Sequence, residues 1–238
     1  IYRQLLNDAL GIDTISAVKA DHTKVSSQWE QLTNKSGNEV SKSDILLKDA
    51  NGQSHGVSWK NGPGRGTSAN YNETRAILLT VIDSNACHKN NTALVKSIND
   101  LLTLWEPVGD KIRTDYSVTT TKLKNGSCYH DELADMVTVA KKLNIMIKNL
   151  VKEYPDFFVD VIRESLVGKN KFGNKPQSAD FYVQCEKDNM NNLQLALSTN
   201  SKEFDSLCEK YLKKININMK SASGYYKHHR SHWIRFDC

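Results

Sequence analysis

The sequence of 238 residues has few of the features that mark secreted, membrane-anchored or metal-ribbon proteins. Its five cysteines, at positions 87, 128, 185, 208 and 238, are widely spaced and form no C-x-x-C pair. We therefore expect neither a disulfide framework nor a zinc ribbon, and this cysteine usage favours a reducing, cytoplasmic setting. No apolar run approaches the roughly 20 residues that span a bilayer, and the first residues show no signal-peptide pattern. No membrane partner is expected.

Neither sign of charge is in large excess. The chain has 32 Lys and Arg against 27 Asp and Glu, a formal net charge of +5. This charge is compatible with an anionic partner such as nucleic acid but does not require one. Hydrophobic residues make up 39% and charged residues 25%, which is typical of a folded chain rather than a disordered one. The length is sufficient for one large domain with its own core.

Several catalytic signatures are also missing. The sequence contains no G-x-x-x-x-G-K-[ST] phosphate loop, no G-x-S-x-G nucleophile turn and no cysteine-protease signature. His228, His229 and His232 lie close together, but no second half of a zinc ligand set lies at the usual spacing. We interpret this segment as a basic loop that is either solvated or in contact with phosphates, with Lys227 and Arg230 as candidate DNA contacts.

Apolar periodicity and turn residues predict a mixed α/β (α+β) chain with a helix-rich middle. Helices are expected within 1–20 (broken near Gly11), over 23–37, from residue 72, and over 92–105, 131–154, 156–168 and 201–212. Strands are expected over 44–47, 56–60, 117–123, 178–185, 215–220 and 232–236, with the last two paired. Residues 169–177 are expected to form a basic, turn-rich loop. We predict a single domain, with a core over about 23–90, C-terminal strands over about 178–238 and a helical insertion over about 92–168.

The segment 41–76 contains the most informative pattern. An apolar run opened by Asp44 is followed by a turn with Asn-Gly at 51–52 and then by a second run that ends at Lys60. This order predicts a β-hairpin. Because side chains alternate along a strand, Ser58 and Lys60 share one face. A glycine-rich loop with Arg65 follows, and then Glu73 in the first turn of a helix.

An acid, a lysine and a second acid around one hairpin suit the hydrolysis of a phosphodiester. Mg²⁺ prefers carboxylate oxygens and keeps several of its waters, so Asp44 and Glu73 suffice to bind it. A lysine between them, Lys60, would orient the attacking water and stabilise the developing charge. The same three residue types are common, and a solvated surface is the competing interpretation of this pattern.

The arrangement resembles the PD-(D/E)XK nuclease superfamily, which includes most type II restriction endonucleases. The likeness covers roughly residues 25–85. Asp44 matches the acid that begins the first core strand, and Ser58-Trp59-Lys60 matches the (D/E)xK tripeptide with Ser in place of its acid. A subgroup of restriction enzymes reads S-x-K and carries the displaced glutamate about a dozen residues later. Here 12 residues separate Lys60 from Glu73.

This resemblance implies a restriction-endonuclease-like mixed sheet flanked by helices. It implies a Mg²⁺-dependent endonuclease that cleaves double-stranded DNA as a homodimer and needs no organic cofactor. It assigns Asp44 and Glu73 to the metal, Lys60 to the water and Ser58 to the vacated acid position. Glu30, on the preceding expected helix, matches the auxiliary acid of the family.

Two questions stay open from the sequence. Arg65 either contacts a phosphate or is a solvated loop residue, and Lys171 in the second basic loop is either a DNA contact or part of a surface turn. The alternative function is a non-catalytic nucleic-acid-binding or virion-associated protein that retains the nuclease fold. The segments 57–73, 164–173 and 221–236 resemble nuclease-like proteins of large tailed bacteriophages. RNA or a DNA junction is the alternative substrate.

Overall fold

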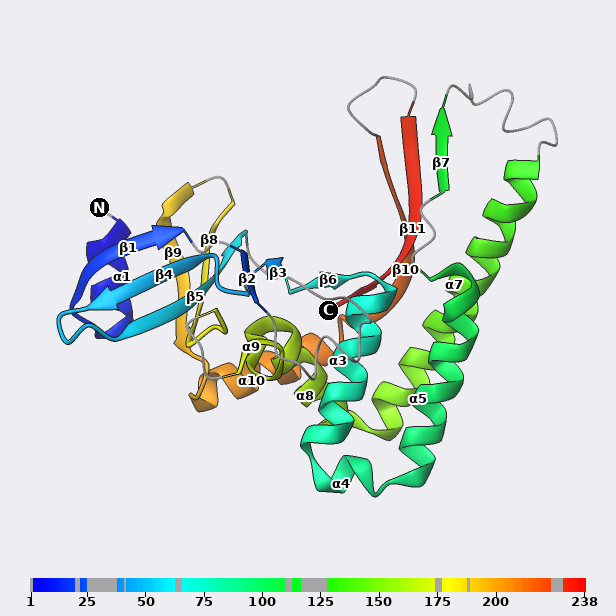
Figure 1. The fold of residues 1–238 in the computed structure, drawn as a ribbon, viewed down its shortest axis with the longest axis horizontal. Coiled ribbons are helices and arrows are strands. Elements are labelled where there is room, and N and C mark those ends of the chain that lie inside the picture. Colours follow the sequence, from blue (N-terminus) through cyan, green and yellow to red (C-terminus); the bar gives the residue numbers. More distant parts are fainter. Residues whose placement is uncertain are drawn as a thin grey trace.

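The computed structural model describes residues 2–19, 22–24, 38–40, 42–62, 66–109, 113–116, 128–173, 177–187, 189–223 and 229–238. A β-sheet with one helix on its outer side occupies one half of the molecule, and long helices occupy the other (Figure 1). Further helices run between the two halves, and a second, smaller sheet projects from the helical half (Figure 1).

The larger sheet has five strands in the order β1-β4-β5-β8-β9. They are β1 (Thr14–Lys19), β4 (Ile45–Asp49), β5 (Ser54–Asn61), β8 (Phe181–Glu186) and β9 (Asn189–Ser198). Neighbouring strands are antiparallel except β5 and β8, which run parallel. The parallel pair brings together segments that lie more than a hundred residues apart, and the chain crosses between them through the helical half.

The described helices are α1 (Tyr2–Leu10), α3 (Tyr71–Ser84), α4 (Ala86–Lys89), α5 (Thr92–Trp105), α7 (Cys128–Glu153), α8 (Pro155–Val167), α9 (Lys169–Phe172) and α10 (Lys202–Leu212), with a 3₁₀ turn η1 (Glu106–Val108) after α5. Helix α1 covers one side of the sheet, and α8 and α10 lie on the other. The prediction of a mixed sheet flanked by helices, with a helix-rich middle, is confirmed. Within the described ranges, no helix combines the length and the apolar character needed to cross a membrane.

The remaining strands form two small sheets. In the first, β11 (His229–Asp237) pairs with β10 (Asn216–Ser223), with β6 (Ser68–Ala69) and with β7 (Arg113–Tyr116). In the second, β2 (His22–Lys24) pairs with β3 (Asn38–Val40). The pairing of β6 with the end of β11 fixes the segment that leads directly into α3.

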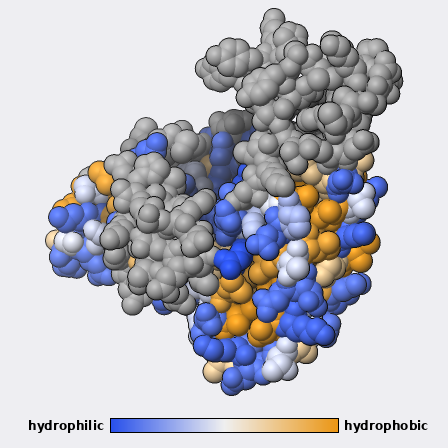
Figure 2. Space-filling model, turned by 45° about the vertical axis from the view of Figure 1, so that its right-hand side comes forward, coloured by the Kyte–Doolittle hydropathy of each residue, from blue (hydrophilic) through white to orange (hydrophobic). Residues whose placement is uncertain are grey.

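The alternation of side chains along β5 separates two hydrophobic clusters. Val57 belongs to a small cluster with Leu6, Leu47 and Val183, which α1 covers. The opposite face of the sheet meets a larger cluster that includes Tyr182 and the apolar faces of α3, α5, α7, α8 and α10. Figure 2 shows hydrophobic residues at the surface of the helical half.

Both faces of β5 are therefore covered, which is why this strand is more deeply buried than a hairpin strand at the surface. Ser58 stands opposite Tyr182 of β8, and Lys60 stands opposite Gln184. The polar positions of the hairpin thus face the helices rather than open solvent.

Most predicted elements are present, including the hairpin, the helix from residue 72, the helix that Gly168 ends, and the paired C-terminal strands. Two predictions were wrong. Ile15 and Val18, expected on a helix, lie on β1 with 53% and 59% of their surface exposed. Residues 169–172, expected in a loop, form α9. Strand β9 was not predicted. Of the helix expected over 23–37, residues 23 and 24 lie on β2 and the rest lie outside the described residues, as does the strand expected over 117–123.

Candidate active site

Asp44 is fixed against the hairpin strand that carries Lys60. Its backbone N–H donates to the carbonyl of Val57 at 2.8 Å, and its Oδ2 accepts the backbone N–H of Trp59 at 2.6 Å. These two bonds extend the β4–β5 ladder by one residue beyond Ile45. The carboxylate of Asp44 therefore lies beside the backbone of Trp59, which separates Ser58 from Lys60.

The Lys60 ammonium lies in a partly desolvated place. Burial lowers the pKa of Lys60, the nearby carboxylate of Asp44 opposes this shift, and the positive charge of Lys42 adds to it. The three side chains are close enough for their charges to interact. The charge of Lys60 therefore interacts with one acid, Asp44, and with a second lysine, Lys42.

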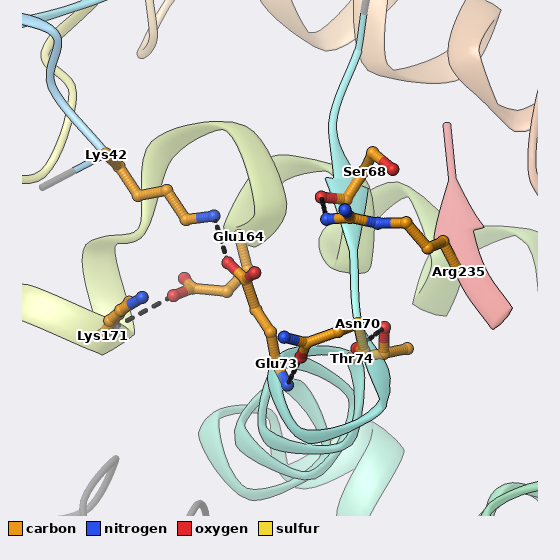
Figure 3. Close-up of polar contacts among 8 residues, drawn as sticks. All are labelled: Lys42, Ser68, Asn70, Glu73, Thr74, Glu164, Lys171 and Arg235. Atoms are coloured by element: carbon orange, nitrogen blue, oxygen red, sulfur yellow. Dashed lines mark hydrogen bonds and ion pairs between the residues drawn. The ribbon is translucent and has the colours of Figure 1, made fainter. Parts of the chain in front are cut away.

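Glu73 enters the site from the first turn of α3. The side-chain Oδ1 of Asn70 accepts the backbone N–H of Glu73 at 2.9 Å and caps the helix. The Glu73 carboxylate extends toward Lys42, and its Oε1 lies 2.7 Å from Lys42 Nζ (Figure 3). A negative charge in this position is also favoured by the helix dipole.

The charges around Glu73 keep its carboxylate ionised. Burial acts to raise the pKa of Glu73, but the positive charges of Lys42, Lys171 and Arg235, together with the hydrogen bond from Lys42, outweigh it and lower the pKa. Figure 3 shows that these three cations come from separate segments of the chain. Glu73 is therefore an ionised carboxylate in a cation-rich environment.

Lys42 joins the two halves of the site. Its backbone N–H and that of Ser43 both donate to the carbonyl of Gln177 at 3.1 Å, and Ser43 Oγ donates to the carbonyl of Ser178 at 2.8 Å. The aliphatic stem of Lys42 passes over Gly168, where a Cβ atom would overlap Lys42 Cγ. The backbone before Asp44 is thereby tied to the segment before β8, and the ammonium reaches Glu73.

Glu164 is a buried acid next to this cluster. Its Oε2 accepts the backbone and side-chain N–H groups of Asn170 at 3.0 Å each, and its Oε1 accepts the backbone N–H of Lys171 at 3.1 Å. Burial raises the pKa of Glu164, and the hydrogen bonds from α9 and the charge of Lys42 oppose that rise. These bonds hold the start of α9 against the end of α8.

Ser58 is a buried residue of β5, two positions before Lys60. It is 1% exposed, and its Oγ has no hydrogen-bond partner among the described residues. Beside it, Tyr182 and Tyr211 join their hydroxyl groups at 2.9 Å, and Gln184 Nε2 donates to both at 2.8 Å. The position that holds an acid in the (D/E)xK pattern is here a small, uncharged side chain next to a closed polar network.

The predicted site residues have separate outcomes. Lys60 interacts with the charges of Asp44 and Lys42, and Glu73 forms an ion pair with Lys42, but no ion pair among the described residues joins Glu73 to Lys60. Lys171 lies in the interior, with its Nζ 5.3 Å from the centre of the Phe172 ring, rather than in an exposed loop. Three other predicted residues, Glu30, Arg65 and Lys227, lie outside the described residues. Arg230 belongs to β11, opposite Asp115 of β7.

Sequence reasoning missed two members of the cluster, Lys42 and Glu164. Lys42 stands two residues before Asp44, which puts both side chains on one side of an extended segment, so its proximity to the acid was open to prediction. Its contact with Glu73, 31 residues further along, was not. The role of Glu164 had no local signal either, because it accepts hydrogen bonds mainly from the backbone of α9, a segment that was expected to be a loop.

The residues that suit a divalent cation are Asp44 and Glu73. Both offer carboxylate oxygens, and the cation already held at Glu73 Oε1 is the Lys42 ammonium, which shows that this oxygen favours a positive charge. In the part of the chain that the structure describes, no group of three or more His, Cys, Asp and Glu side chains gathers to hold a metal. A divalent cation held by these two carboxylates would take the rest of its ligands from water.

A polar cavity of about 740 Å³ lies on the other side of Glu164. Three of its charged residues are already engaged: Asp160 lies 2.8 Å from His88, Arg163 contacts Asp205, and Asp180 accepts the backbone N–H of Gly56 at 2.9 Å. These contacts join the sheet to the helices, and the hairpin lysines do not line the cavity.

Comparisons with known proteins add a likeness of fold. No protein-family model and no curated protein matches the sequence. Among solved structures, the crystal structure of restriction endonuclease MspI in complex with its cognate DNA is similar, with 12% sequence identity and a TM-score of 0.45. The match covers 95% of this chain and 74% of that chain.

Proposed function

We propose that this protein is a metal-dependent nuclease that hydrolyses the phosphodiester bonds of DNA at Asp44, Lys60 and Glu73. The observation that supports this function most is the bond from Trp59 N–H to Asp44 Oδ2. This bond holds an acid beside the strand that carries a partly desolvated lysine. A second acid, Glu73, forms an ion pair with Lys42, whose charge also acts on Lys60.

Each residue has a chemical task under this proposal. A divalent cation held by Asp44 and Glu73 would supply a water of lowered pKa and would neutralise charge on the phosphate. Lys60 orients the attacking water and stabilises the charge that develops on the phosphate oxygens. Desolvation strengthens that interaction, because a charge in a medium of lower dielectric constant acts more strongly on its neighbours. Ser58 adds no charge and leaves the floor of the site neutral.

The finer features of the proposal come from the resemblance to restriction endonucleases of the S-x-K type. We infer Mg²⁺ as the metal, double-stranded DNA as the substrate and site-specific cleavage as the outcome. A homodimer would provide one active site for each strand. Arg65, Lys227 and Arg230 stay candidate contacts to DNA phosphates, whereas Lys171 is buried.

Cleavage of plasmid DNA tests this function directly. The protein is incubated with supercoiled and linear DNA in the presence of Mg²⁺ and, in parallel, of EDTA. We expect discrete products with Mg²⁺, none with EDTA, and at least a 100-fold lower rate for Lys60→Ala and Glu73→Gln. Circular dichroism checks that both variants are folded. Normal cleavage by Lys60→Ala would show that the site is misassigned. Single-stranded RNA and a four-way DNA junction serve as alternative substrates.

A second candidate, a non-catalytic nucleic-acid-binding protein, is favoured by one observation. The Lys42 ammonium occupies Oε1 of Glu73, so a proposed metal ligand already has a counter-ion. With Lys60, Lys171 and Arg235 nearby, the site would then attract a phosphate without cleaving it. Intact DNA with Mg²⁺, together with a shifted band in a native gel, would support this alternative.

A further inference from the structure

We propose that Lys42 is a built-in counter-ion that occupies Glu73 in the metal-free protein and leaves when a divalent cation binds. This inference rests on the proposed function, because it assumes that Glu73 is a metal ligand. It goes further by assigning a role to a lysine that the S-x-K pattern does not contain.

The first argument is direct competition for one oxygen. Lys42 Nζ lies 2.7 Å from Glu73 Oε1, which is the range of a charge-assisted hydrogen bond. The two side chains are 15% and 26% exposed, so bulk water screens the pair only in part. A metal that took the same oxygen would stand next to an ammonium group, and two cations at that distance repel each other strongly. Binding of one therefore requires the release of the other.

The second argument concerns what can move. The backbone of Lys42 is held by the bond from its N–H to the carbonyl of Gln177, and the next residue is anchored by Ser43 Oγ on Ser178. The ammonium stands at the end of a flexible four-carbon stem, which passes over Gly168 where no Cβ obstructs it. Lys42 can therefore leave Glu73 by rotation of its side chain while the Asp44 backbone keeps its position.

The third argument distinguishes Lys42 from the other cations around Glu73. Lys171 is buried on α9, whose first turn is held by the bonds to Glu164. Arg235 donates from Nη2 to the carbonyl of Ser68 at 2.8 Å. Both act on Glu73 through their charge and are held by other contacts. Lys42 is, within the described ranges, the cation that forms an ion pair with the Glu73 carboxylate, and a metal at that oxygen would replace it.

Metal binding in the absence of DNA tests the proposal. Mn²⁺ is titrated calorimetrically into the wild-type protein and into Lys42→Met, in which the thioether side chain keeps the apolar stem over Gly168 and loses the charge. We expect Lys42→Met to bind Mn²⁺ roughly tenfold more tightly, as removal of about 1.4 kcal/mol of competition would give. Lys42→Arg keeps a cation that can pair with Glu73, and we expect its affinity to stay within threefold of wild type.

Lys48→Met is the matched control. Lys48 is an exposed lysine on β4, the strand that follows Asp44, so this variant loses the same charge without a contact to Glu73. We expect its Mn²⁺ affinity to equal that of the wild type within twofold. An equal gain in Lys42→Met and Lys48→Met would overturn the proposal, because net charge alone would then explain it.

Two further outcomes separate this inference from the proposed function. If Lys42→Met binds Mn²⁺ as weakly as the wild type or more weakly, Lys42 is not a competitor, even when the wild-type protein cleaves DNA with Mg²⁺. If Lys42→Met binds Mn²⁺ more tightly and the wild-type protein cleaves no nucleic acid, the counter-ion role stands and the nuclease function is rejected. If Lys42→Met/Glu73→Gln binds Mn²⁺ no more tightly than Glu73→Gln alone, Lys42 competes with the metal through Glu73.

Discussion

Asp44 and Trp59 are joined across the hairpin by a hydrogen bond of 2.6 Å between the Trp59 backbone N–H and Asp44 Oδ2. This contact uses a side chain to continue the ladder beyond the last paired residues of β4. It therefore fixes a carboxylate next to Lys60 at the cost of one ordinary backbone pairing, and it ties the geometry of the candidate site to the register of the hairpin.

Substitutions of Asp44 should separate its charge from this structural bond. Asn keeps an oxygen that can accept the Trp59 N–H but carries no charge. We expect Asp44→Asn to lose at least 100-fold in DNA cleavage while its free energy of unfolding changes by less than about 1 kcal/mol. Asp44→Ala loses the acceptor as well and should be destabilised by a further ~1 kcal/mol. Urea denaturation and a plasmid cleavage assay measure the two effects, and full activity of Asp44→Asn would contradict the metal-ligand role.

A comparison of two glycines should reveal how closely Lys42 packs on α8. Gly168 and Gly11 each follow the last residue of a helix, with similar positive φ angles of 66° and 65°, so an alanine costs about 1 kcal/mol of backbone strain at either position. At Gly168 the new Cβ would also overlap Lys42 Cγ, whereas at Gly11 it meets nothing within 4 Å. We expect Gly168→Ala to be less stable than Gly11→Ala by roughly 1–3 kcal/mol in urea denaturation. Equal stabilities would show that the Lys42 stem yields freely.

The buried acid Glu164 should make stability depend on pH in a defined direction. The pKa of Glu164 in the folded protein is raised above its ordinary value of 4.5, so the folded state prefers the protonated form. The contribution of Glu164 to stability is therefore fully present below pH 4.5 and is lost as pH rises toward its folded pKa. Glu164→Gln does not titrate. The wild-type protein should exceed this variant in stability by more at pH 4 than at pH 7, measured by urea denaturation. A difference that grows with pH would contradict the raised pKa.

Ser58 should be replaceable at little cost. Its hydroxyl group is buried without a hydrogen-bond partner among the described residues, and an unsatisfied buried hydroxyl destabilises the fold by about 1–3 kcal/mol. We expect Ser58→Ala to be as stable as the wild type or up to about 1 kcal/mol more stable, with DNA cleavage within threefold. Tyr211→Phe is the contrast, because it removes the hydrogen bonds of the Tyr211 hydroxyl with Tyr182 and Gln184 and should cost about 1–3 kcal/mol. A large loss of cleavage in Ser58→Ala would assign Ser58 a direct role in the chemistry.

The sequence by itself determined the features of this protein that depend on neighbouring residues. The hairpin follows from Asn51-Gly52 between two apolar runs, the start of α3 from Asn70, and the end of α8 from Gly168, whose positive φ suits glycine. The alternation on β5 placed Ser58 and Lys60 on one face. These outcomes need only local hydrogen bonds and steric limits, which a single segment carries.

Tertiary structure decided the rest. Ile15 and Val18 lie on a strand because β1 pairs with β4, and Lys169–Phe172 form a helix because Glu164 accepts the N–H groups at its start. The ion pair between Lys42 and Glu73 arises from segments 31 residues apart, brought together by the anchoring of residues 42 and 43 on the chain before β8. Charge and burial depend on which distant groups the fold brings close, and no local pattern in the sequence contains that distance.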